Sequence, residues 1–60
     1  MSQRIYRPGE IVPVSGQYGA VTVWGSWTGR EVTCVRGERF PPTYHPEAGY
    51  KLRDATIHRR

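Results

Sequence analysis

Residues 17–36 form the longest part of the chain with neither a proline nor a break in its pattern, and they constrain the fold most. Residues 21–24 are β-branched or aromatic, which suits a strand over 17–24. Residues 30–36 alternate in the same way, and Gly25 and Gly29 lie between the two segments. The spacing predicts an antiparallel hairpin with a loop of about three to five residues.

The hairpin's buried face is left open by the sequence. Alternation places Tyr18, Ala20 and Trp24 on one face and Gly19 on the other. A slip of one residue in the pairing would exchange the two faces. One face is expected to be core and the other a platform. Gly19 fits either a β-bulge or a plain glycine at a strand edge.

Short extended segments separated by proline and glycine make up the rest of the chain. Residues 7–10 predict a turn, and residues 11–14 an edge strand or an unpaired strip, because Pro13 has no amide hydrogen for a ladder. Three prolines in residues 41–46 favour polyproline II. Residues 50–53 predict a last strand, and residues 54–56 a turn or the cap of a short helix. No window has useful helical periodicity.

These elements predict an all-β fold. We expect a small antiparallel meander of three to four short strands, of the size of an SH3-like or open mini-barrel domain, covered by extended strips that contain proline. Sixty residues make one small domain spanning 1–60. Residues 1–6 and 58–60 are expected to be loose tails, with Ile5 and Tyr6 able to dock.

Soft metal ligands are few and scattered. Cys34, His45 and His58 do not form a paired spacing, so the sequence predicts neither a metal site nor a cofactor. A single cysteine excludes an internal disulfide, and Cys34 in mid-strand is expected to be a small buried side chain. One cysteine and no apolar segment at the start of the chain fit a cytoplasmic protein. No apolar run approaches the roughly 20 residues that cross a bilayer.

Catalysis is not expected. The serines need a base held within hydrogen-bond reach, but one histidine lies among prolines and the other in a tail. The five acidic residues are spread along the chain rather than paired, and the glycines form no phosphate-binding motif. The sequence therefore predicts a non-catalytic binding or adaptor domain.

The net charge of +4 raises nucleic-acid binding as an alternative. Between residues 8 and 58, five basic and five acidic residues cancel, so the excess lies in Arg4, Arg7, Arg59 and Arg60. Basic ends can hold phosphate but do not alone make a specific site. A protein partner is therefore the first hypothesis. Nucleic acid comes second, and a monomer or a weak homo-oligomer through an edge strand is expected.

Candidate partner-binding residues are aromatic side chains and nearby arginines, because these pair stacking with charge. On the hairpin they are Tyr18, Trp24, Trp27, Arg30 and Arg36. The interpretation we favour for the two tryptophans is structural, with Trp24 in the core and Trp27 closing the loop.

Residues 41–44 read Pro-Pro-Thr-Tyr, which matches a ligand pattern of WW-type grooves and adds Tyr44 to the candidates. The motif is only four residues long. We favour the alternative that these prolines wrap over tryptophan and tyrosine side chains to close the core.

Several motifs together resemble the YjzC-like family of small bacterial proteins. They are Arg-Pro-Gly-Glu at 7–10, Pro-Val-Ser-Gly-Gln-Tyr at 13–18, Thr-Gly-Arg-Glu-Val-Thr at 28–33, Gly-Glu-Arg-Phe-Pro-Pro-Thr at 37–43 and Tyr-Lys-Leu-Arg-Asp-Ala-Thr at 50–56. The resemblance spans roughly residues 4–58 and implies a short single-domain intracellular protein. It supplies no catalytic or binding residues. The tryptophan-containing segment 24–28 is outside its pattern.

Overall fold

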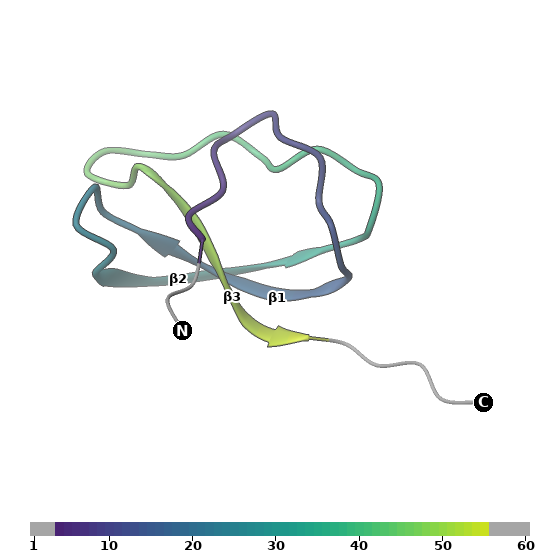
Figure 1. The fold of residues 1–60 in the computed structure, drawn as a ribbon. Coiled ribbons are helices and arrows are strands. Elements are labelled where there is room, and N and C mark those ends of the chain that lie inside the picture. The colour runs from purple at the N-terminus through teal and green to yellow at the C-terminus, as the bar shows by residue number, and fades with distance from the viewer. Residues whose placement is uncertain (1–3, 56–60) are drawn as a thin grey trace.

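The computed structural model describes residues 4–55, which form one open antiparallel sheet of three strands (Figure 1). The strands are β1 (Gly16–Val21), β2 (Trp27–Cys34) and β3 (Gly49–Ala55). This confirms the predicted all-β class, and no helix occurs between residues 4 and 55. The tail predicted at 58–60 lies outside the described residues, as do residues 1–3 of the N-terminal tail.

The strand order is β2-β1-β3, so the first strand in the chain is central. This differs from the expected meander, in which each strand would lie beside the next one in sequence. The long connection over residues 35–48 passes above the sheet and returns the chain on the other side of β1 (Figure 1). A connection of this length replaces the short turn that a meander needs.

The hairpin forms with a loop over residues 22–26, which has the predicted length but begins earlier in the chain than predicted. β1 ends at Val21 and β2 begins at Trp27, so Gly29 lies inside a strand rather than in the loop. Gly19 pairs with Glu31 and Val21 pairs with Trp27. Ala20 therefore faces the three residues 28–30, and Gly29 has φ of +97° there. Glycine accepts this conformation, which is why the irregularity forms at this position.

β3 confirms the predicted last strand and extends it at both ends. Asp54 and Ala55 belong to the strand, so the expected turn or helix cap at this point is wrong, and Thr56 lies outside the described residues. Gln17 pairs with Asp54, whereas Tyr18 pairs with Leu52, which leaves one extra residue on β3. Pairing with β1 supplies the hydrogen bonds that a sequence-local turn would otherwise provide.

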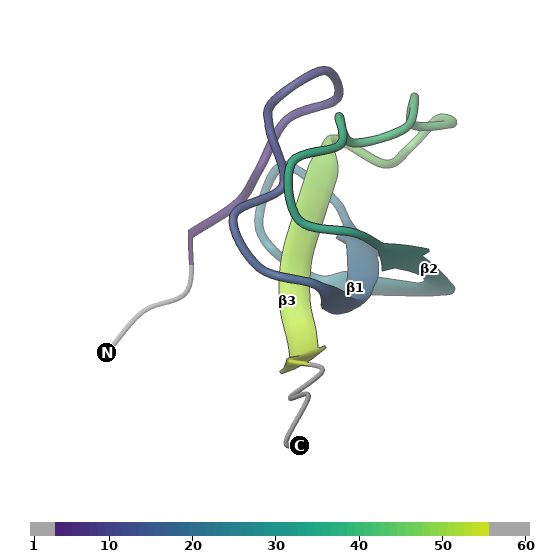
Figure 2. The ribbon, with the colours of Figure 1, turned by 90° about the vertical axis from the view of Figure 1, so that its right-hand side faces the viewer.

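Two extended strips cover one face of the sheet: the N-terminal strip, residues 4–15, and the connection over residues 35–48 (Figures 1 and 2). They pair with each other, since the Val12 amide donates to the Glu38 carbonyl at 2.7 Å and the Phe40 amide to the Glu10 carbonyl at 2.9 Å. Ile11 is bridged to Arg39 in the same ladder. The extended strip predicted over residues 11–14 is thus paired with a second strip rather than with the main sheet.

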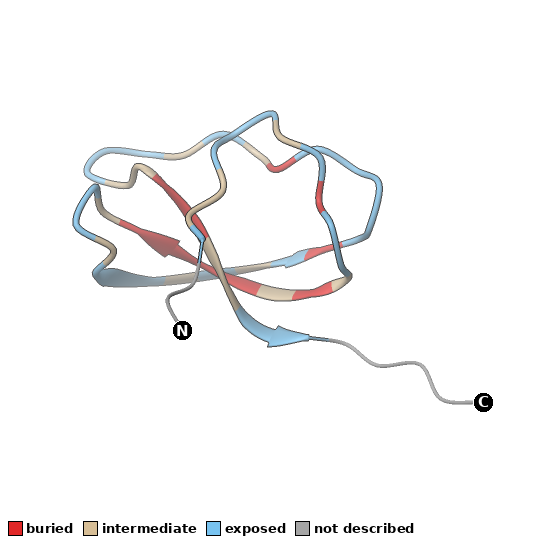
Figure 3. Cartoon of the chain, in the orientation of Figure 1, coloured by how far each residue is buried: buried red, intermediate tan, exposed pale blue. Residues whose placement is uncertain are grey.

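The core lies between the sheet and these strips. Its buried side chains are Val12, Tyr18, Ala20, Cys34, Phe40 and Tyr50. Figure 3 shows the buried positions along β1 and at the start of β3. The Phe40 ring stacks with the rings of Tyr6 and Tyr50 at centroid distances of 5.1 and 5.5 Å. The Tyr18 ring meets Phe40 edge-on at 4.9 Å, so one aromatic cluster joins the strips to the sheet.

Residues 4–6 are docked, which corrects the predicted loose tail for that part. The amide of Tyr6 donates to the carbonyl of Tyr50, and the amide of Tyr50 donates back, both at 2.8 Å. A methyl group on Gly49 would lie 2.5 Å from the Tyr6 carbonyl oxygen, so only glycine allows this approach. Tyr6 therefore covers part of the outer edge of β3.

On the opposite face of the sheet, the Trp27 indole lies over Gly19. A Cβ atom at Gly19 would fall 2.4 Å from one ring carbon of Trp27 and 2.5 Å from another. Gly19 is buried although it has no side chain of its own. A cross-strand aromatic ring that covers a strand glycine shields its backbone from water.

We predict that Gly19→Ala destabilises the domain by about 1 kcal/mol, because the new methyl group forces the indole away. In a Trp27→Thr background the same substitution is expected to stabilise by about 0.5 kcal/mol, since alanine loses less backbone entropy than glycine. Urea unfolding of the four proteins of this cycle measures both values. Equal effects in the two backgrounds would contradict the contact.

Candidate interaction surface

The hairpin turn presents Trp24 to solvent. The turn is held by the Thr22 amide donating to the Ser26 carbonyl and the Gly25 amide to the Thr22 carbonyl, both at 2.9 Å. The amides of Trp24 and Ser26 also donate to the Thr22 hydroxyl at 3.3 and 3.4 Å. Trp24 is 86% exposed, and its neighbour Val23 is exposed as well. The favoured core position of Trp24 is therefore wrong, because β1 ends before the chain reaches it.

A depression of about 240 Å³ lies beside this turn. Its lining comes from three segments distant in sequence: Ile5 and Arg7 from the N-terminal strip, Val23 from the turn and Ala48 from the residue before β3. The Ala48 amide donates to the Val21 carbonyl at 2.7 Å, which fixes one wall against the end of β1.

Trp27 is the first residue of β2 and reaches across the central strand. The Lys51 ammonium nitrogen and the Arg53 guanidinium carbon, both on β3, lie 5.0 and 4.9 Å from its ring centroid. These are cation–π distances. Trp27 is 43% exposed, yet its ring already has cationic partners within the domain. Trp27 therefore belongs to a strand, which corrects the expectation that it closes the loop.

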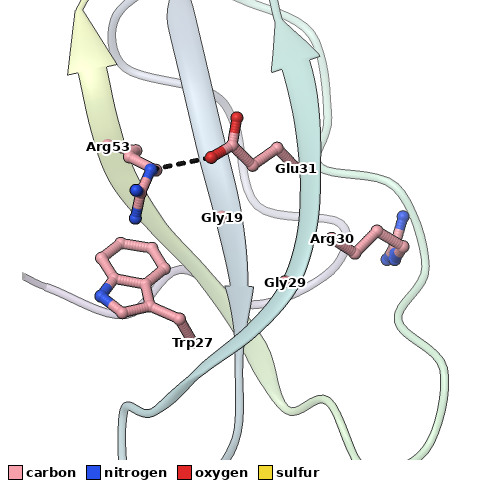
Figure 4. A pocket seen from close by; sticks show the side chains of 6 residues that line it. All are labelled: Gly19, Trp27, Gly29, Arg30, Glu31 and Arg53. Carbon is pink, nitrogen blue, oxygen red and sulfur yellow. Dashed lines mark ion pairs between the residues drawn. The ribbon is translucent and has the colours of Figure 1, made fainter.

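A second depression, of about 370 Å³, occupies this face of the sheet and is lined by Gly19, Trp27, Gly29, Arg30, Glu31 and Arg53. Figure 4 shows Arg53 and Glu31 meeting above Gly19, with a nitrogen–oxygen distance of 2.8 Å. Glu31 also accepts a hydrogen bond from the Gln17 amide at 3.5 Å. The charged groups that a ligand would use here are engaged with one another.

Arg30 points away from Trp27 (Figure 4) and binds Glu47 instead. Its Nε and Nη2 atoms donate to the two carboxylate oxygens at 2.9 and 2.8 Å. The Glu47 side chain is only 7% exposed and also accepts hydrogen bonds from the Tyr44 amide at 2.9 Å and the Thr28 hydroxyl at 3.4 Å. These donors lower the pKa of Glu47 to about 2, chiefly through Arg30, and Glu47 raises the pKa of Arg30.

Tyr44 lies against the same ion pair. The Arg30 guanidinium carbon is 4.9 Å from the Tyr44 ring centroid, and Tyr44 remains 63% exposed. The preceding proline segment contacts a core tyrosine through its backbone, since the Tyr50 hydroxyl donates to the Pro42 carbonyl at 2.8 Å. The alternative that these prolines wrap over tryptophan and tyrosine side chains stays a prediction, and no tryptophan takes part in this contact.

Tyr18 and Arg36 lie apart from the other candidates. Tyr18 is fully buried, and its hydroxyl donates to the Val14 carbonyl at 2.7 Å, so it belongs to the core rather than to a surface. Burial raises the pKa of Tyr18. Arg36 is exposed beyond the end of β2, whereas Trp24 precedes its start. The single surface expected from the two tryptophans, Tyr18 and both arginines is not formed.

Cys34 is buried, as predicted for a small apolar side chain, and burial raises the pKa of its thiol. Within residues 4–55, no three His, Cys, Asp or Glu side chains gather where they could hold a metal ion. That same part of the chain has no helix capable of crossing a membrane.

Sequence reasoning missed Ile5, Val23 and Ala48 as surface residues, because nothing in the sequence brings these three segments together. It also missed Glu47 as the partner of Arg30. Arg7 was noted for its charge, but its place beside the turn follows only from the docking of Tyr6 on β3.

We predict that Glu47→Gln lowers the free energy of unfolding by about 2 kcal/mol, because a charged bidentate hydrogen bond is replaced by a neutral amide. Glu38→Gln is the matched control at an exposed glutamate without a side-chain hydrogen bond in the described structure, and it should change stability by less than about 0.5 kcal/mol. Urea unfolding at neutral pH measures both. Similar effects of the two substitutions would contradict a structural role for the pair.

The pKa of Glu47 also predicts how stability depends on pH. Its folded-state pKa of about 2 is lower than the ordinary 4.5, so its contribution is complete above pH 4.5. As the pH falls, the unfolded chain binds the proton first, and the free energy of unfolding decreases until the folded carboxylate is also protonated. Unfolding curves across this window should show a shallower decrease for Glu47→Gln than for Glu38→Gln. Equal slopes would contradict the prediction.

Comparison of the chain with models of protein families, with curated proteins and with solved structures found no match. The resemblance to the YjzC-like family therefore stays a prediction, and the candidate surface is judged from its own geometry.

Proposed function

We propose that this chain is a non-catalytic binding domain that uses its hairpin turn to hold a protein partner. One observation carries the proposal: among the phenylalanine, tyrosine and tryptophan rings of residues 4–55, only that of Trp24 has neither another such ring nor a cation against it. Four rings, those of Tyr6, Tyr18, Phe40 and Tyr50, pack together. The rings of Trp27 and Tyr44 lie beside cations.

An exposed tryptophan in an ordered turn suits a binding hot spot. Tryptophan is enriched among residues that dominate binding energy, because it buries a large rigid surface. The hydrogen bonds around Thr22 order the turn in advance, so little conformational entropy remains to be lost on association. Val23 beside Trp24 adds a further exposed apolar group.

The charge arrangement favours protein over nucleic acid as the partner. Seven basic side chains fall within residues 4–55, and three of them, Arg4, Arg30 and Arg53, form ion pairs with glutamates. Arg30 was among the candidate partner-binding arginines, and its Nε and Nη2 atoms both donate to Glu47. A phosphate-tracking groove needs several unpaired cations along one path.

The open edge of β2 is a poor site for pairing with a second copy. The three residues 28–30 face one residue of β1, and Gly29 has a positive φ, so the outer edge is irregular in its first half. Irregular edge strands oppose extension of a sheet by another chain. We therefore place the partner at the turn.

We predict that Trp24→Ala weakens partner binding at least tenfold and changes the free energy of unfolding by less than about 0.5 kcal/mol, because Trp24 is 86% exposed. Val35→Ala, at another exposed apolar residue, is the matched control and should bind normally. Affinity capture from cells of the source organism, followed by titration of the captured protein, tests this. Capture that persists in Trp24→Ala would overturn the proposal.

Titration with oligonucleotides separates the nucleic-acid alternative. We expect the tryptophan fluorescence of Trp24→Phe and Trp27→Phe to stay unchanged on addition of single-stranded or duplex DNA at low salt. Quenching that weakens steeply with added salt would instead indicate phosphate contacts with stacked bases. The stacking tryptophan would then be the one that remains in whichever variant still shows this quenching.

A further inference from the structure

We propose that the depression beside the hairpin turn receives an apolar side chain of the partner, and that Arg7 binds a carboxylate next to that side chain. This inference rests on the proposed function and names the partner's chemistry: a peptide segment in which an apolar and an acidic residue are neighbours.

The walls of the depression favour an apolar side chain of the partner. Three of its four lining residues, Ile5, Val23 and Ala48, have purely aliphatic side chains. At about 240 Å³ it is smaller than the roughly 300 to 1,000 Å³ typical of small-molecule sites. A single side chain is a better match in size than a cofactor. Trp24 follows Val23 in the same turn, so one partner segment can contact both.

Arg7 favours a carboxylate next to that apolar side chain. It is the only charged residue that lines the depression. The Glu10 carboxylate is nearby but engaged, because one oxygen accepts from Arg4 at 2.6 Å and the other from the backbone amide of Arg7 at 2.9 Å. The Arg7 guanidinium thus has no hydrogen bond or ion pair with any of residues 4–55, and it can bind a carboxylate through two parallel hydrogen bonds.

The charges around the turn point the same way. The Lys51 ammonium donates to the Gly25 carbonyl at 3.3 Å and so places a second cation close to the turn. Glu47 lies one residue before the lining Ala48, but its carboxylate is neutralised by Arg30. An acidic partner meets complementary charge here, whereas a basic one is repelled.

The lining is held in place before any partner binds. The two hydrogen bonds between Tyr6 and Tyr50 fix the strip that carries Ile5 and Arg7. The hydrogen bond from the Ala48 amide to the Val21 carbonyl fixes the third segment. A preformed depression loses little entropy on binding, which makes a small site of this kind effective.

The test uses a small probe with both chemical features, 4-phenylbutyrate, and its neutral analogue 4-phenylbutyramide. Methyl signals of Ile5, Val23 and Ala48 are followed by NMR in the whole chain at low salt. We expect the carboxylate to shift these three residues selectively and to bind about tenfold more tightly than the amide. Arg7→Gln should remove that tenfold difference, and Arg36→Gln, at another exposed arginine, should preserve it.

Three results would overturn the inference: shifts spread over the whole surface, equal binding of the two probes, or unchanged discrimination in Arg7→Gln. Shifts of the same methyl groups with protein concentration alone would overturn it too, since a second copy would then be the occupant. Failure of the proposed function is distinguishable, because partner capture that persists in Trp24→Ala leaves the probe result standing. If Trp24→Ala loses capture but the wild-type chain binds the carboxylate and amide probes equally, the proposed function stands and the inferred partner chemistry is wrong.

Discussion

Tyr50 joins every layer of this domain, and the other contacts depend on it. Its backbone pairs with Ala20 on the central strand and with Tyr6 on the N-terminal strip. Its ring stacks on Phe40, and its hydroxyl accepts from Arg30 at 3.0 Å while donating to the Pro42 carbonyl. The side chain is fully buried, and its hydroxyl oxygen acts both as a hydrogen-bond donor and as an acceptor. A chain of 60 residues has too little interior for separate cores, so one tyrosine connects sheet, strips and ion pair.

Local patterns in the sequence were sufficient for the elements but not for their arrangement. Alternation identified the hairpin and the last strand, because side chains of period two are set by the strand backbone itself. The position of β1 between the other two strands depends on where a long connection crosses, and no local pattern encodes that. Trp24 illustrates the limit. Alternation predicted a strand that includes Trp24, whereas β1 ends three residues earlier, at Val21, where hydrogen bonds around Thr22 begin the turn.

The candidate site was less predictable than the fold for the same reason. The sequence singled out aromatic and arginine residues as candidates, but their roles depend on contacts with residues far away in sequence. Arg30 is held by Glu47, and Trp27 lies between the cations of β3, so both serve the domain's own stability. Tyr18 is core. Residue type indicates what a side chain can do, but pairing across 17 or more positions decides what remains available for a partner.

Most aromatic rings and many charged groups of this domain have partners within it, so an exposed group without such a partner is informative. Scattered exposed apolar side chains are normal on small domains and carry no functional information alone. Trp24 differs because every other phenylalanine, tyrosine and tryptophan ring of residues 4–55 has a ring or cation contact, and because hydrogen bonds order the turn that presents Trp24. Arg7 differs in the same way, since the adjacent carboxylate of Glu10 is directed to Arg4 and to the backbone. Two unpartnered groups of complementary chemistry beside one preformed depression favour recognition of an apolar and acidic segment over a purely structural role.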